Sequence, residues 1–75
     1  MHHYREAGMT DRLSYAELSE IFEGAANSRR QLIADHRRRK DRPDTWFHQQ
    51  ERELRAFMQA QQDYRRAADK ERSAA

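Results

Sequence analysis

The chain has 75 residues, of which 37% are charged and 36% hydrophobic, and its fifteen Lys and Arg exceed its thirteen Asp and Glu by two. The length allows one small domain, and the absence of cysteine excludes disulfides and thiolate metal sites. The longest apolar runs are only two or three residues, too short for a membrane span or a signal peptide. We therefore expect a soluble, cytoplasmic protein.

Few residues favour strands or turns. Only two Gly and one Pro interrupt the sequence, and there is no Val. This composition predicts an all-α fold, with two or three helices in a hairpin-like arrangement. We expect residues 1–10 to be a flexible leader, residues 11–72 to form a single helical domain, and residues 73–75 to be a frayed tail.

The first helix has a clear start signal. Ser14-Tyr-Ala-Glu17 matches a capping box, in which the serine oxygen and the glutamate carboxylate each accept a backbone N–H that lacks a partner. Leu13 precedes the cap and is placed for a hydrophobic staple against Leu18. The next apolar residues recur at three- and four-residue spacing and predict one inward face, formed by Tyr15, Leu18, Ile21 and Phe22.

The segment Glu23–Ser28 has two interpretations. In one, the helix stops at Gly24 and a second helix begins near Ser28, where Ser-Arg-Arg-Gln is another capping-box pattern. In the other, the helix continues, because a helical Gly costs only about 1 kcal/mol relative to Ala. The unbroken three- and four-residue spacing supports this second interpretation through a longer row of residues, namely Tyr15, Leu18, Phe22, Ala25, Arg29, Leu32 and His36.

The run Asp41-Arg-Pro-Asp-Thr45 predicts a firm boundary, because Pro disfavours helix at the residue before it and Asp or Thr can cap the next helix. A long helix is expected over about 45–72. Its inward stripe combines two rows with seven-residue spacing. One row is Phe47, Leu54, Gln61 and Ala68, and the other is Gln50, Phe57, Tyr64 and Glu71. Outside the stripe, Glu51 and Arg55 are spaced for an i,i+4 ion pair. A helix of about 28 residues is about 42 Å long. Its stripe must pair with the N-terminal helix, a second copy or another protein, and we expect a homodimer.

Residues 29–42 hold seven basic and two acidic residues, a net charge of +5. If this segment is helical, Leu32, Ile33 and His36 face inward, and Arg30, Arg37 and Arg38 lie on the outer arc. Such a patch suits a polyanion, either the phosphates of a nucleic acid or an acidic protein surface. The plainer interpretation is a solvated face whose arginines complement the helix dipole at its C-terminal end.

The sequence offers little material for catalysis. It has no Cys and no Gly-rich loop, and the serines are best explained as caps or surface residues. His36 and His48 flank the predicted turn, but neither has a ligand-type residue at i,i+4, so a metal site is not expected. We expect no enzyme activity and no cofactor.

Residues 13–40 contain the segment from Leu13 to Phe22, a Gly-containing turn and then Asn27-Ser-Arg-Arg-Gln-Leu-Ile-Ala. This region resembles a helix-turn-helix DNA-binding unit. Its turn is about one residue longer than that of the family. In such units the second helix enters the major groove and its N-terminal side chains read bases. The resemblance implies that Asn27, Ser28, Arg29 and Gln31 are base readers and that Arg37–Lys40 contact the backbone.

The sequence therefore predicts a non-catalytic binding protein that contacts DNA through residues 29–42. The candidate binding residues are Asn27, Ser28, Arg29, Arg30, Gln31, Arg37, Arg38, Arg39, Lys40, Arg42 and Trp46. Trp46 is included because Trp and Arg are enriched in binding hot spots. The alternative is a small protein-binding adaptor or inhibitor, such as a phage-encoded blocker of a host defence complex, that uses the same Arg-rich surface and Trp46.

Overall fold

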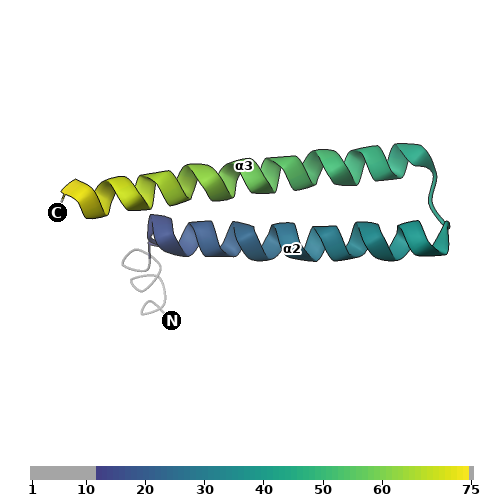
Figure 1. The fold of residues 1–75 in the computed structure, drawn as a ribbon, viewed down its shortest axis with the longest axis horizontal. Helices are drawn as coiled ribbons and strands as arrows, with labels where there is room; N and C mark the ends of the chain where they lie inside the picture. The colour runs from purple at the N-terminus through teal and green to yellow at the C-terminus, as the bar shows by residue number, and fades with distance from the viewer. Residues whose placement is uncertain (1–11, 75) are drawn as a thin grey trace, which may run out of the picture.

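The computed structural model describes residues 12–74, which form two antiparallel helices joined by a short connection (Figure 1). Helix α2 spans Tyr15–Arg39 and helix α3 spans Asp44–Ala74. The predicted all-α hairpin is confirmed in its two-helix form, and the described part contains neither a third helix nor a strand. The predicted leader, residues 1–10, lies outside the described residues.

Helix α2 begins at the predicted capping box. The Ser14 hydroxyl oxygen accepts the Glu17 backbone N–H at 3.0 Å, and the Ser14 N–H donates to the Glu17 carboxylate at 2.8 Å. Ser14 itself is extended, with φ −74° and ψ 163°, as an N-cap residue requires. The hydrogen bond donated by the Ser14 backbone N–H is also the main reason that the pKa of Glu17 lies below its ordinary value.

Helix α2 runs without interruption through Gly24, so the continuous interpretation of residues 15–39 is the observed one. Gly24 does not have a positive φ, and a Cβ added to it would meet nothing within 4 Å. The turn that the other interpretation required between Glu23 and Ser28 is absent. Ser28 lies in the middle of a helix, and its hydroxyl is not an N-cap.

The predicted boundary near Pro43 is confirmed. Helix α2 ends at Arg39, and Lys40 adopts the left-handed conformation, with φ 55° and ψ 40°, while its N–H donates to the His36 carbonyl at 2.8 Å. The Pro43 carbonyl accepts the N–H groups of Trp46 and Phe47 at 3.0 and 3.4 Å and thereby opens helix α3. That helix continues through Ala74, two residues beyond its predicted end, so Ser73 and Ala74 are helical and not a frayed tail.

The core is a single seam between the two helices. Its buried apolar residues are Ala26, Ile33 and Phe47. Ser19 is also buried, and its hydroxyl donates to the Gln61 carbonyl at 3.2 Å. No side chain is completely removed from solvent within residues 12–74. Two helices can cover each other along one line only, which explains why so few residues are buried.

Aromatic rings close the half of the seam that lies away from the turn. The centroid of the Tyr64 ring lies 6.0 Å from that of Tyr15 and 5.8 Å from that of Phe22, and Phe22 also packs on Phe57 at 6.2 Å. The predicted α3 stripe is therefore confirmed as the contact surface. Its last member, Glu71, is exposed.

Three residues of α2 predicted to face inward are exposed, and only Tyr15, at 40%, still packs its ring on α3. Ile21 is 53% exposed and Leu32 is 39% exposed, because helix α3 contacts α2 along the row of Phe22, Ala26 and Ile33. Both lie beside this contact line and are left uncovered by the partner helix. Neither α2 nor α3 combines the length with the apolar composition that a bilayer crossing demands.

Candidate binding surface at the hairpin turn

Basic residues are concentrated where α2 ends and the chain turns back. We call this set the turn cluster, and its members are Arg37, Arg38, Arg39, Lys40 and Arg42. All five residues are exposed. The sequence predicted all five as binding residues, and the fold places them within one turn of helix and one short connection. One end of the hairpin thus carries five cationic groups that a partner can reach.

Two aromatic rings at the start of α3 support the turn cluster. The Arg37 guanidinium lies 4.7 Å from the centroid of the Phe47 ring, and the Arg42 guanidinium lies 5.4 Å from that of Trp46. Trp46 is half-buried and also contacts the His36 ring edge-on at 4.9 Å. Stacking of this kind orients a guanidinium while leaving its edge free for other groups.

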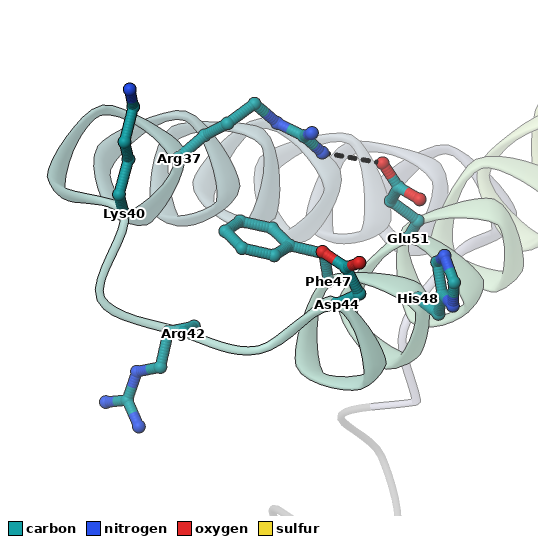
Figure 2. A pocket seen from close by; sticks show the side chains of 7 residues that line it. All are labelled: Arg37, Lys40, Arg42, Asp44, Phe47, His48 and Glu51. Carbon is teal, nitrogen blue, oxygen red and sulfur yellow. Dashed lines mark hydrogen bonds and ion pairs between the residues drawn. The ribbon is translucent and has the colours of Figure 1, made fainter.

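A shallow depression of about 360 Å³ opens beside Phe47, between the end of α2 and the first turns of α3 (Figure 2). Its lining combines cationic, acidic and aromatic side chains, namely Arg37, Lys40, Arg42, Asp44, Phe47, His48 and Glu51. Figure 2 shows the Arg37 side chain reaching across to Glu51, whereas Arg42 points away from the Phe47 ring. The depression is open and too mixed in charge to resemble an enclosed small-molecule site.

Several cations of the cluster have acidic neighbours. Arg37 donates to Glu51 of α3 at 2.9 Å, which replaces the Glu51–Arg55 pair expected from the sequence. Arg38 and Arg39 both pair with Asp35 one turn earlier on α2. These pairs are exposed and therefore contribute little to stability. No ion pair within residues 12–74 involves Lys40 or Arg42.

His36 and Asp41 form a further contact at the turn. The His36 Nδ1 atom lies 2.8 Å from the Asp41 carboxylate, and this hydrogen bond is the main reason that the pKa of Asp41 is lowered. The contact ties the last turn of α2 to the connection that carries Arg42. His36 therefore has a structural contact at the turn, next to the residues of the turn cluster.

Arg29, a predicted base reader, has a different role. Its guanidinium is half-buried, donates to both Gln50 and Glu53 of α3, and lies 5.3 Å from the centroid of the Phe57 ring. Hydrogen bonds from Gln49 and then from Arg29 lower the pKa of Glu53. Arg29 therefore joins the two helices, and its donors are used inside the molecule.

The other predicted base readers lie on the exposed surface of α2. Arg30 donates to the Asn27 side chain at 2.7 Å, while Ser28 and Gln31 are exposed nearby. Asn27 precedes Arg37 by ten residues, or about 15 Å along a helix axis. These residues lie in the middle of one long helix, whereas a helix-turn-helix reader places them at the start of its second helix.

Some residues at the surface were not singled out from the sequence as binding residues. Phe47, Asp44 and Glu51 line the depression, but only the pairing of α2 with α3 brings them beside Arg37. His48 is exposed in the same lining. Among residues 12–74 there is no group of three or more His, Asp or Glu side chains arranged to hold a metal ion.

Comparisons of the chain with protein-family models, curated proteins and solved structures find no match.

Proposed function

We propose that the protein is a non-catalytic binding protein whose turn cluster contacts nucleic acid, with duplex DNA as the favoured target. The observation that carries the proposal is the placement of Arg37, Arg38, Arg39, Lys40 and Arg42 at one exposed end of the hairpin. Five cations at one exposed end suit a polyanion, and Arg forms bidentate contacts with phosphate.

The distribution of charge along the hairpin supports this choice of surface. The half nearer the turn, residues 28–53, has eight basic and five acidic residues and a net charge of +3. The rest of the described chain, residues 12–27 and 54–74, has six of each. A polyanion is therefore attracted to the turn end and has no equivalent site at the open end.

The proposed contact is electrostatic and independent of base sequence. Arg29 is engaged with Glu53 and Gln50, and the mid-helix position of Asn27–Gln31 removes the geometry by which a recognition helix enters the major groove. Contacts to phosphate alone give weak binding, with dissociation constants of about 10⁻⁴–10⁻⁶ M at physiological salt, and a steep salt dependence.

A salt titration of binding to a fluorescent DNA duplex tests the proposal. If all five cations of the turn cluster neutralise phosphates, the logarithm of the affinity should fall with the logarithm of salt concentration with a slope of about −4.5. The double variant Arg38→Gln with Arg39→Gln should weaken binding and make the slope shallower by about 2. These two side chains pair only with Asp35 of their own helix, so the hairpin itself should be retained.

The matched control is Arg65→Gln with Arg66→Gln, which removes the same charge from an exposed part of α3 at the other end of the hairpin. The control should keep both the affinity and the salt slope. Equal losses in the two double variants would mean that net charge, not the turn cluster, drives binding. No binding at low salt would overturn the proposal.

An acidic protein surface is the second candidate partner. It is favoured by the carboxylates that already lie against this surface, because Arg37 holds Glu51 and both Arg38 and Arg39 hold Asp35. Under this alternative, the chain captures one stoichiometric protein, and Trp46→Ala weakens that capture. DNA then competes poorly with the captured protein.

A further inference from the structure

One flank of the hairpin is apolar and uncovered. Helical periodicity of 100° per residue places Leu18, Ile21, Ala25 and Leu32 along one side of α2, beside its contact line with α3. Ile21 and Leu32 are among the most exposed large hydrophobic residues of the described chain, and Leu18 and Ala25 are half-buried. These four residues continue the hydrophobic surface of α2 beyond what α3 covers.

Helix α3 extends the same flank. The side of α3 that follows the periodicity of Trp46 carries Phe57, Ala60, Tyr64 and Ala67, all half-buried, and also the carboxylates of Glu53 and Glu71. The two helices present this side together, because a shallow groove between them is lined by Arg12, Leu13, Ser14, Tyr15, Leu18, Tyr64 and Glu71. We call the combined surface of Leu18, Ile21, Ala25, Leu32, Phe57, Ala60, Tyr64 and Ala67 the apolar flank.

The opposite groove between the helices has a different character. Near the open end it is lined mostly by polar and charged side chains, including Glu20, Glu23, Arg65, Asp69 and Arg72. Closer to the turn, the same side carries the Arg37–Glu51 ion pair. The hairpin is therefore more apolar on one side than on the other, although the half-buried Arg29–Glu53 ion pair crosses the apolar flank beside Phe57.

We infer that a second copy of this chain covers the apolar flank, so that two hairpins form an antiparallel four-helix bundle. Antiparallel here means that the turn of one hairpin lies beside the open end of the other. The bundle would bury the outer sides of both helices at once and would give each hairpin the second layer that a stable domain needs.

The surface area fits a second copy. The chain exposes 6440 Å², whereas a compact monomer of 9.1 kDa exposes about 4,900 Å². The excess of about 1,500 Å² per chain is more than the roughly 800 Å² per partner that an interface of standard size buries. Only three apolar residues are buried in the single hairpin, and with no cysteine in the chain there is no disulfide to stabilise so small a core.

Charge selects the direction of packing. The turn half has a net charge of +3, and the other half is neutral. A parallel pair would place two such turn ends side by side, whereas an antiparallel pair places each against a neutral end of its partner. The twofold axis then passes near Asn27, the midpoint of α2, and brings Ile21 of one chain level with Leu32 of the other.

Two measurements on the full chain test this arrangement. Light scattering over a range of concentrations should give about 18 kDa, twice the chain mass. The variant Ile21→Glu should shift the protein to monomer, because a buried unpaired carboxylate opposes association. The matched control Ala34→Glu adds the same charge at an exposed site on the other side of α2 and should leave the dimer intact. A monomer throughout, or a dimer that is insensitive to Ile21→Glu, overturns the inference.

Cysteine cross-linking tests the direction of packing and does not depend on how the charged variants fold. The chain has no cysteine, so Ile21→Cys and Leu32→Cys each introduce a unique thiol. Mixed and oxidised, the two variants should form a disulfide with each other in preference to either with itself. Self-linking of Ile21→Cys would indicate a parallel pair, and a dimer without any cross-link would place the contact elsewhere. Either result overturns the antiparallel bundle.

Discussion

The replacement of Gly24 by Ala tests the continuous helix α2 directly. It should stabilise a single continuous helix and destabilise a helix-turn-helix. Gly24 is exposed in the interior of the helix, its φ is not positive, and an added Cβ would have open space around it. Ala is more favourable than Gly in a helix interior by about 0.8–1.0 kcal/mol, so Gly24→Ala should stabilise the fold by about that amount. For a unit of this size, 1 kcal/mol corresponds to a rise of about 4–8 °C in Tm.

The assay is thermal unfolding followed by circular dichroism at 222 nm, with every variant at the same concentration so that any association contributes equally. Ala34→Gly is the matched control, because Ala34 is exposed in the same helix, and it should lower the Tm by a similar amount. If residue 24 instead occupied a turn with positive φ, Ala would be strained there by about 1–2 kcal/mol. A fall in Tm for Gly24→Ala would therefore refute the continuous helix.

Two further predictions concern the seam and its carboxylates. Ile33→Ala removes one of the few buried apolar side chains and should cost about 2–3 kcal/mol of unfolding free energy, whereas Leu32→Ala should cost much less when both are made in the monomeric Ile21→Glu background; equal losses in that background would contradict the observed burial of these neighbours. The pKa values of Glu17 and Glu53 lie below their ordinary 4.5, so their contribution to stability is present above that pH and is lost as the pH falls through the lower folded-state values. The Tm should therefore fall in acid. The double variant Glu17→Gln with Glu53→Gln should have a lower Tm at neutral pH and a smaller fall of Tm in acid. If the fall in acid is unchanged, these two carboxylates are not its source.

Local sequence signals determined the start of α2 and the boundary between the helices, but not the C-terminal end of α3. The Ser14–Glu17 capping box and the Pro43 boundary act between residues three or four apart, so their geometry hardly depends on the rest of the chain. The seam of α3 also followed from sequence, because the Phe47–Leu54–Gln61 spacing can place only one side of that helix inward. Where local signals conflicted, as at Gly24, they left two alternatives open. The modest cost of one helical Gly and the packing of Phe22 and Ala26 on α3 favour the single helix.

Tertiary structure decided the roles of individual side chains. In the sequence Arg29 and Arg37 belong to the same basic run, but Arg29 is drawn into contacts with Glu53 and Gln50 while Arg37 stays exposed at the turn. Ile21 and Leu32 satisfy a helical hydrophobic pattern and still lie on the surface. The physical reason is that periodicity fixes which residues share a side of one helix. The position of the second helix then decides which of them are covered and which charges are neutralised.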